Sequence, residues 1–392
     1  MLNKNFGPII IPFISFFILV IGLSIQNTLI PIRLENSGFS IFNIGIVYSC
    51  YYMGMLISSF KTDKYIYKLG FLRSYIYSVI IFAITAILHI LSDNIYFLSF
   101  LRMATGFSIA SLFIILESWR LAVCKYNYRG KVMALYNIGY YGSYAFGQYL
   151  LNFTDYKSNY NFLVIFIIGI SSIIPFTNNN QNLKNPTEHK TVSLLYLLKI
   201  APLAAIVSII AGFDTSVIYS LVPVYLNGYI TTEYIGSIMS LTLLSAMIIQ
   251  YPIGKLSDVV DRKIIIITLS IIQLIISLLL YLNISSNIIY VTILLMILGG
   301  VTYTFYPLGI NILCDSVKPT YIVAATQLYV LVNIIGAIFG PIIAPIFVHS
   351  KNQNGIFLYL SLCSMLIIPS TVNILVSKLN KFINNKSYLS KI

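Results

Sequence analysis

Residues 254–263 read GKLSDVVDRK and form a short charged break between apolar runs at 233–253 and 264–282. A similar break, DKYIYKLGFLR at 63–73, stands between two further apolar runs. About 20 apolar residues are needed for one helix that crosses a bilayer. Each break is therefore predicted to be the turn between two membrane spans.

Apolar runs of this kind continue along the whole chain. The sequence places twelve of them, at 8–32, 41–60, 72–91, 95–119, 132–153, 160–177, 200–226, 233–253, 264–282, 288–313, 321–348 and 355–377. The longest polar break, 178–199, falls at the middle of the chain. We predict an all-α membrane protein with 12 transmembrane helices in two six-helix pseudo-repeats. Its expected parts are an N-terminal bundle (1–177), a cytoplasmic linker (178–199), a C-terminal bundle (200–377) and a basic cytoplasmic tail (378–392).

The composition excludes an ordinary soluble protein. Of the 392 residues, 58% are hydrophobic and only 9% are charged, whereas a soluble chain has roughly 25% charged residues. With so little charge the chain cannot cover its surface in water, so lipid is the expected solvent. The first apolar run is too long for the core of a signal peptide and is expected to remain as the first span.

Lysine and arginine are distributed unequally between the two sides of the predicted membrane. Twenty of the 24 lie in breaks on the side of the N-terminus, and three, Arg33, Lys157 and Lys351, lie on the other side. Basic loops mark the cytoplasmic side, which predicts an even number of spans with both termini in the cytoplasm. The net charge of +13 is explained by this orientation, so no nucleic-acid partner is expected.

The two halves also repeat in sequence. LIPIRL at 29–34 ends the first run, and LVPVYL at 221–226 ends the seventh run 192 residues later. An Ile-Gly pair follows at 44–45 and again at 235–236, an offset of 191. Similar offsets at separate markers indicate parallel repeats about a central linker, a common architecture of secondary transporters.

The break at 254–263 resembles the signature loop of the major facilitator superfamily, Gly-x-Leu-x-Asp-Arg-x-Gly-Arg-Lys. The matching residues are Gly254, Leu256, Asp258, Arg262 and Lys263, and the loop departs at Val259 and Asp261. In the first half Lys68 and Gly70 fit, while Tyr67 stands where the family has Asp. The resemblance implies a gate in which Asp258 pairs with a nearby cation and latches the cytoplasmic side. The alternative is a plain positive-inside anchor.

Small-residue patterns within the spans support the same resemblance. Arg102, Gly106 and Ala110 follow at intervals of four and resemble the family's second motif, often linked to proton coupling. The fifth span holds Gly139, Gly142 and Gly147, similar to the bend of the family's exporters but without its Gly-Pro core. The eleventh span offers Gly336, Gly340 and Pro341 as a packing bend.

Finer similarity points to the YcaD-type bacterial inner-membrane permeases. It is carried by NTLIP at 27–31, ILES at 115–118, the stretch 140–148 and the stretch 299–307, and it extends from about residue 20 to 348. The resemblance implies a transporter fold and location but no particular substrate.

Charges inside the spans need an explanation, because a charge in the hydrocarbon region costs several kcal/mol. Arg102, Glu117 and Asp214 are the candidates for proton or substrate coupling. Arg102 and Glu117 lie about 60° apart around one helix and roughly 22 Å apart along it. The small residues between them leave room for a neighbouring helix or a water-filled cavity. Glu117 either serves coupling or pairs with Arg120 one turn on.

Asp214, near the middle of the seventh span, is the principal candidate for a protonatable or substrate-binding carboxylate. The alternative is a structural Asp that pairs with Arg102 or with a hydroxyl group. Polar and aromatic residues of other spans are candidates for the substrate cleft, although each could instead bond to one neighbouring helix. They are Gln26, Asn27, Asn137, Gln148, Tyr219, Gln250, Tyr303, Tyr306, Gln327 and Asn333.

No metal site or cofactor is expected. The four cysteines, Cys50, Cys124, Cys314 and Cys363, and the three histidines, His89, His189 and His349, are scattered without ligand spacing. We interpret the cysteines as packing residues.

The favoured function is a monomeric secondary transporter that moves a small solute by alternating access, driven by protons. The few charges within the spans favour a neutral or singly charged solute. The alternatives are a uniporter and a transporter-fold sensor, although the short basic tail lacks a signalling domain. An embedded enzyme is not expected, since no paired catalytic groups stand at membrane depth, and no P-loop pattern for an ATP-driven pump occurs.

Overall fold

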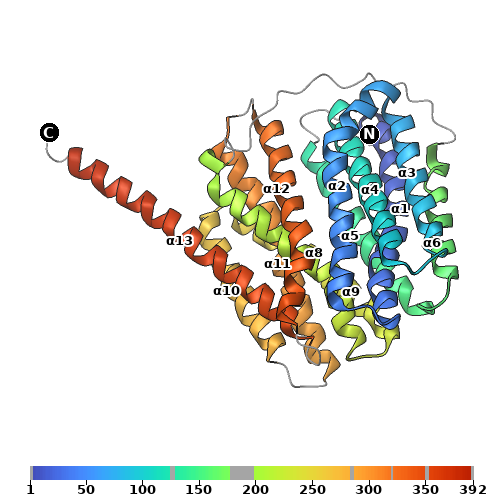
Figure 1. Cartoon of the computed structure of the whole chain (residues 1–392). Helices are drawn as coiled ribbons and strands as arrows, with labels where there is room; N and C mark the ends of the chain where they lie inside the picture. Colours follow the sequence, from blue (N-terminus) through green and yellow to red (C-terminus); the bar gives the residue numbers. More distant parts are fainter. Residues whose placement is uncertain are drawn as a thin grey trace.

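The computed structural model describes residues 3–123, 129–176, 198–282, 287–318, 321–348 and 353–389, and these are helical without a strand. The N-terminal half contains α1 (Asn3–Asn36), α2 (Ile41–Leu69), α3 (Phe71–Leu88), α4 (Ile95–Val123), α5 (Arg129–Leu150) and α6 (Tyr160–Ser171). The C-terminal half contains α8 (Pro202–Asn227), α9 (Thr232–Leu256), α10 (Arg262–Tyr281), α11 (Ile288–Ser316), α12 (Ile322–Ile343) and α13 (Gly355–Leu389) (Figure 1). Short 3₁₀ turns are η2 (Leu151–Phe153), η3 (Ile174–Phe176) and η5 (Ala344–Phe347).

The predicted fold class is confirmed. Within the described residues, ten helices are long and apolar enough to cross a membrane. The remaining two predicted spans are α5, which carries more polar residues, and the shorter apolar segment Tyr160–Phe176, formed by α6 and η3. The predicted linker lies almost wholly outside the described residues. The predicted tail begins inside α13, which continues as a helix beyond the bundle (Figure 1).

The helix boundaries repeat between the halves as the sequence predicted. Helices α2 and α9 begin at Ile41 and Thr232, and α3 and α10 begin at Phe71 and Arg262, an offset of 191 residues in both cases. The ends of α1 and α8, at Asn36 and at residue 227, have the same offset. The two halves are therefore structural repeats.

Local chemistry explains several of these boundaries. The Ser40 hydroxyl accepts a hydrogen bond from the Asn43 amide at the start of α2, and the Asp261 carboxylate accepts one from the Lys263 amide at the start of α10. Such caps satisfy amides that a helix leaves without partners. Capping gives a reason for Asp261 at a position where the family motif has glycine. Gly70, with φ of 78°, makes the sharp turn between α2 and α3.

Glycines set the closest helix contacts inside each half. A Cβ atom at Gly54 would collide with the Met103 carbonyl, and one at Gly106 would collide with the Tyr51 carbonyl, so α2 and α4 pack backbone to backbone. The small residues after Arg102 therefore leave room for a neighbouring helix at Gly106. In the other half, Gly336 packs in the same way against α8, as expected for a packing site.

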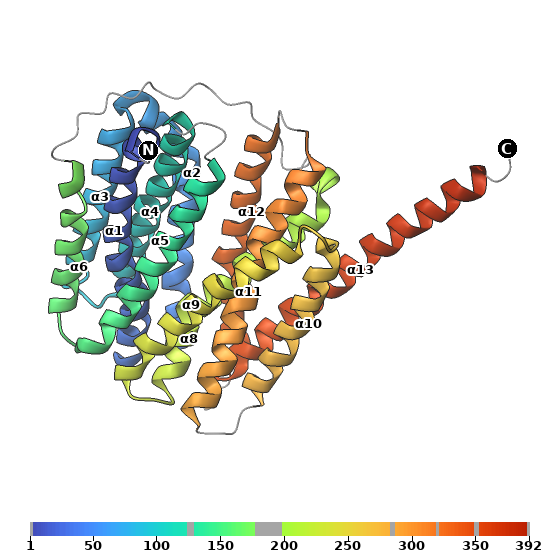
Figure 2. The same cartoon turned by 180° about the vertical axis from the view of Figure 1, so that it is seen from behind.

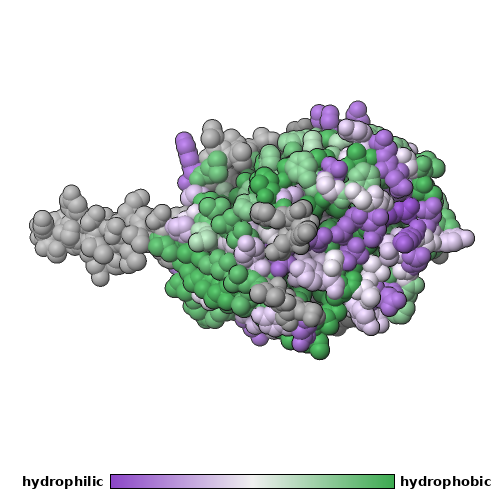
Figure 3. Space-filling model, turned by 60° about the horizontal axis from the view of Figure 1, so that its bottom comes forward, coloured by the Kyte–Doolittle hydropathy of each residue, from purple (hydrophilic) through white to green (hydrophobic). Residues whose placement is uncertain are grey.

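The most extensive contacts between the two halves are those of α2 with α12, α5 with α9, and α1 with α8. We call the end where α1 begins the N-terminal face and the end where α1 finishes the opposite face. From behind, the ribbons of the halves converge toward the opposite face and diverge toward the N-terminal face (Figure 2). A view toward the opposite face shows hydrophilic residues gathered there and a broad apolar flank beside α13 (Figure 3).

Candidate functional site

Tyrosines from both halves gather where the halves meet. This tyrosine cluster consists of Tyr48, Tyr51, Tyr140, Tyr141, Tyr144, Tyr219 and Tyr303. Tyr144 of α5 contacts Tyr219 of α8 with ring centroids 5.3 Å apart, and Tyr219 contacts Tyr303 of α11 at 5.6 Å. Aromatic rings at such distances attract one another in tilted arrangements, so Tyr144, Tyr219 and Tyr303 form a run of ring contacts that joins both halves.

Arg102 lies beneath the cluster in the N-terminal half and is fully buried. Its guanidinium group stands 4.7 Å from the ring centre of Tyr48 and 4.6 Å from that of Tyr51, and it donates a 2.8 Å hydrogen bond to the Asn27 amide oxygen. The ring faces stabilise the charge by about 0.5–2 kcal/mol each. No carboxylate pairs with Arg102 among the described residues.

Asn27 joins this arginine to the interface between the halves. Its amide nitrogen donates a 2.7 Å hydrogen bond to the Tyr144 hydroxyl, while its backbone carbonyl accepts one from the Tyr48 hydroxyl. A path of direct contacts therefore runs from Arg102 through Asn27 and Tyr144 to Tyr219 in the other half. Displacement of one half against the other would disturb the last step of this path, the contact of Tyr144 with Tyr219.

Gln250 of α9 makes a second bridge. Its amide donates hydrogen bonds to the Tyr141 hydroxyl of α5 at 3.2 Å and to the Tyr303 carbonyl at 3.0 Å. The structure thus brings together four of the predicted cleft residues, namely Asn27, Gln250, Tyr219 and Tyr303.

Glu117 lies on α4 one turn beyond Phe113, whose ring packs on Tyr140 of the cluster. Its side chain is exposed, and it stands close enough to Tyr306 of α11 for their charges to interact. Glu117 and Tyr306 are therefore near each other although their helices belong to different halves. The side chain of Arg120, the alternative partner of Glu117, lies outside the described part of the chain.

Asp214 occupies a separate site inside the C-terminal half. It is fully buried, and one carboxylate oxygen accepts a 2.8 Å hydrogen bond from Gln273 of α10. The Gln273 oxygen accepts a 3.3 Å bond from Thr302 of α11, and the Cys363 thiol of α13 is also adjacent. Tyr219, five residues on, points about 140° away around the helix. Asp214 therefore faces away from the tyrosine cluster and is not paired with Arg102.

The other predicted cleft residues are dispersed. Gln148 and Gln26 are fully buried in the N-terminal half, where Gln148 accepts a 2.5 Å bond from Thr28. The Asn333 amide donates a 2.9 Å hydrogen bond to the Ser208 carbonyl and so joins α12 to α8. This is the alternative to a place in the substrate cleft, namely a bond to one neighbouring helix. Asn137 is half-buried and Gln327 is exposed.

At the predicted gate loop the ion pair is not the expected one. Arg262 pairs with Asp315 of α11 in the same half, whereas Asp258 is exposed and forms no ion pair with the described residues. Gly254 has open space around it, Lys68 is exposed, and Lys263 follows the Asp261 cap. Asp258 is therefore unlatched in this arrangement of the halves.

Sequence reasoning missed the contacts that close the opposite face. The Glu35 carboxylate of α1 accepts hydrogen bonds from Asn227 at 3.0 Å and from Gln353 at 2.8 Å. Asn152 of η2 donates to the Ser237 hydroxyl of α9 at 2.6 Å and accepts from its amide at 3.1 Å. We call these five residues the opposite-face clasp. They stand at helix ends and carry no sequence pattern, so only the tertiary structure reveals them.

The scattered histidines and cysteines form no ligand cluster within the described ranges. His89 is buried, bonds to the Thr85 carbonyl at 2.6 Å and stacks on Phe162, which is a packing role. Cys50 and Cys314 are half-buried and Cys363 is buried. Cys124, His189 and His349 lie outside the described residues.

Two repeated six-helix halves around a shared polar and aromatic interface define a membrane transporter. The family model of the Major Facilitator Superfamily matches residues 12–203 and 204–378. The chain belongs to this superfamily.

Curated relatives agree with the resemblance to YcaD-type permeases. The uncharacterized MFS-type transporter YcaD of Shigella flexneri is 26% identical over 364 residues, which cover 92% of this chain and 94% of the relative. Its counterpart in Escherichia fergusonii is 25% identical over 362 residues with the same coverage.

Solved structures share the fold. The nucleoside transporter NupG superposes with a TM-score of 0.77 at 14% identity, covering 93% of this chain and 98% of NupG. An inward-facing, occupied bacterial homolog of the human lysosomal transporter Spinster gives 0.69 at 10% identity and covers 100% of this chain and 98% of its own.

Proposed function

We propose that this transporter moves a small solute by alternating access, with the tyrosine cluster as the solute site. The observation that carries the proposal is the contact of Tyr144 with Tyr219 and Tyr303, which joins the two halves at one aromatic surface. A solute bound there touches both halves, so its binding energy can favour one arrangement of the halves over another. Phenol and amide groups suit a planar solute with a few hydrogen-bonding groups and at most one charge.

The arrangement supports a state closed at the opposite face and open at the N-terminal face. The opposite-face clasp holds the halves together at one end. At the other end, Glu117 is exposed although it lies near Tyr306 of the second half. The unlatched Asp258 agrees with an open N-terminal face. With twenty basic residues on that side, it is the cytoplasmic face of a bacterial inner membrane in this proposal.

Asp214 is our candidate for the group that binds and releases the proton that drives transport. One oxygen of its carboxylate accepts the 2.8 Å hydrogen bond of the Gln273 amide nitrogen. Protonation leaves an acceptor oxygen but adds an O–H donor, which needs an acceptor of its own in this buried site. Protonation would therefore add a donor to the link that Gln273 and Thr302 make between α8, α10 and α11, which are helices of one half. Glu117 is the second candidate, because it is exposed between the halves.

Transport into liposomes that contain a pH dye tests this proposal. The protein is reconstituted and challenged with pooled metabolites and drugs. One pool contains nucleosides, because the structurally similar protein NupG is described as a nucleoside transporter. A solute-dependent pH change establishes proton-coupled transport. Solute uptake without a pH change supports a uniporter. Binding without uptake supports a sensor and refutes the transport proposal.

A further inference from the structure

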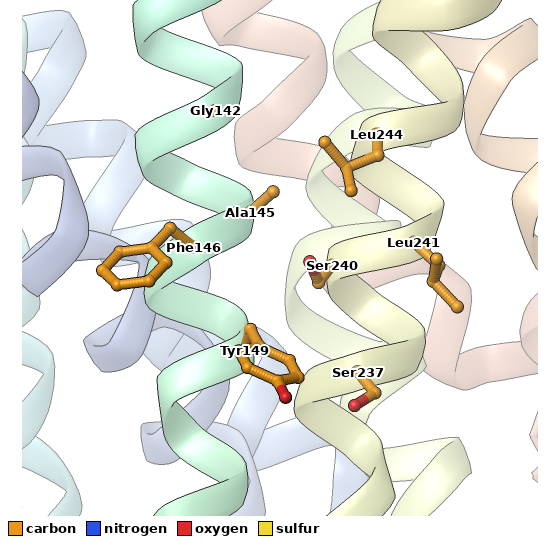
Figure 4. A pocket seen from close by; sticks show the side chains of 8 residues that line it. All are labelled: Gly142, Ala145, Phe146, Tyr149, Ser237, Ser240, Leu241 and Leu244. Atoms are coloured by element: carbon orange, nitrogen blue, oxygen red, sulfur yellow. The ribbon is translucent and has the colours of Figure 1, made fainter.

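A cavity opens in the side of the molecule between α5 and α9, one helix from each half (Figure 4). We call it the seam pocket. Its volume is about 500 Å³, and it is lined by Gly142, Ala145, Phe146, Tyr149, Ser237, Ser240, Leu241 and Leu244. Ala145 and Tyr149 point from α5 toward α9, and Ser240 and Leu244 point back toward α5 (Figure 4). The volume is in the range of about 300–1,000 Å³ that binding sites commonly have.

Two hydrogen-bonded bridges between the halves frame the seam pocket. Gln250 and Tyr141 form the bridge on its N-terminal side, and Asn152 and Ser237 form the one on its opposite side. Thirteen residues of α9 separate the two bridges, which is about 20 Å along the helix. Between the bridges the wall at Gly142 is open, since a Cβ atom there would meet no other atom within 4 Å.

The chemistry of the walls indicates what fills the pocket. The walls are mainly hydrocarbon, and one of their hydroxyls, that of Ser237, is already bonded to Asn152. A buried water needs two to four polar partners, and these walls offer few. The side chains of Phe146 and Leu241 line the pocket and are exposed, so its apolar surface continues onto the flank that faces lipid. Hydrocarbon chains of the bilayer therefore reach the pocket directly.

We propose that the seam pocket binds one hydrocarbon chain of a membrane phospholipid. The chain lies between α5 and α9 and fills a space that the protein leaves open between its halves. Because the walls belong to different halves, the width of the pocket depends on the arrangement of the halves. Chain binding is therefore specific to the arrangement described here, and this consequence rests on the alternating-access proposal. The proposal that the pocket binds a hydrocarbon chain does not depend on alternating access.

Photolabelling in a defined bilayer tests the proposal. The protein is placed in nanodiscs of phosphatidylethanolamine and phosphatidylglycerol, with a diazirine either in the middle of an acyl chain or on the headgroup. After irradiation, peptides that contain 142–149 and 237–244 are analysed by mass spectrometry. We expect adducts there from the chain probe and few from the headgroup probe. Equal adduct yields from the two probes, or no adducts in these peptides, would overturn the proposal on the wild-type protein alone.

Variants that fill the pocket sharpen the test. Gly142→Leu and Ser240→Leu place bulk on opposite walls, and each is expected to lower the adduct yield about tenfold. Ile248→Phe adds similar bulk on exposed α9 surface outside the lining, so its yield is expected to stay at the wild-type level. Unchanged yields in the filled variants would refute the assignment. If they lose yield equally with Ile248→Phe, a general effect on labelling explains the loss and the proposal fails.

The dependence on conformation has its own readout. Glu35→Ala weakens the opposite-face clasp and is expected to lower the adduct yield as the halves leave this arrangement. If wild-type labelling is specific but Glu35→Ala leaves it unchanged, the pocket binds lipid and its link to alternating access is wrong.

Discussion

Removal of the Glu35 carboxylate should open the opposite face. Glu35 accepts hydrogen bonds from Asn227 at 3.0 Å and from Gln353 at 2.8 Å, and both donors belong to the other half. Hydrogen bonds to charged groups contribute about 1.5–3 kcal/mol when buried. Glu35 is half-buried, so about 1 kcal/mol for each bond is the reasonable value after solvent screening. Loss of both bonds, about 2 kcal/mol, shifts the equilibrium between the two arrangements roughly 30-fold.

A cysteine at Ser49 reports this shift. Ser49 is buried and bonds to the Ile338 carbonyl across the contact of α2 with α12. In a background without the native cysteines, Ser49→Cys should react with a membrane-impermeant maleimide only when the opposite face opens. The rate follows the fraction of open molecules while that fraction is small. We expect Glu35→Ala to raise the rate roughly 30-fold, up to the limit set by full opening.

The matched control is Glu233→Ala. Glu233 is an exposed acidic residue in the first turn of α9 at the same face, and it forms no ion pair with the described residues. Its loss removes the same charge without removing a bond between the halves. An unchanged maleimide rate in Glu35→Ala, or an equal increase in Glu233→Ala, would refute the reasoning.

Three further predictions follow from the site and the packing. Asp214→Asn should insert into the membrane normally but abolish the solute-driven pH signal in liposomes, and full activity in this variant would exclude Asp214 from coupling. Tyr219→Ala should raise the KM for the identified solute about tenfold while Tyr219→Phe changes it little, since loss of the ring removes aromatic contacts; equal KM values in both variants would argue against a ring contact. Gly106→Leu should destabilise the bundle by about 1–3 kcal/mol because it collides with Tyr51, seen as a lower Tm in detergent, whereas Gly142→Ala, which has open space, should leave the Tm unchanged.

The site shows where sequence reasoning stopped. The sequence indicates Arg102 as a charge inside a span and Asn27 as a polar candidate for the substrate cleft. Their bond to each other joins residues 75 positions apart, and nothing in either helix's own pattern specifies it. Tyr140, Tyr141 and Tyr144 were not selected, because the chain has 31 tyrosines and an individual one carries little information. Their spacing along one side of α5 was the only available signal.

Asp214 gives the same lesson in a different form. Its place in the seventh span predicts a position at the cleft, because that span lines the cleft in the fold that the resemblance implies. Rotation about the helix axis decides otherwise and turns the carboxylate toward Gln273, while Tyr219 faces the other half. Sequence position fixes the angle between two residues of one helix, but the direction that each faces depends on how that helix packs.

The sequence by itself determined the class of protein, the succession of apolar helices in two halves and the repeat of 191 residues, and the caps at Ser40 and Asp261 are equally local. These features follow from hydrophobic length and local hydrogen bonding, which act within a few turns of one chain segment. Only the tertiary structure decided that Arg102 binds Asn27, that Glu35 closes the opposite face and that a pocket lies between α5 and α9. Those features arise from contacts between helices far apart in the sequence. They depend on the relative rotation and tilt of whole helices, which no local pattern encodes.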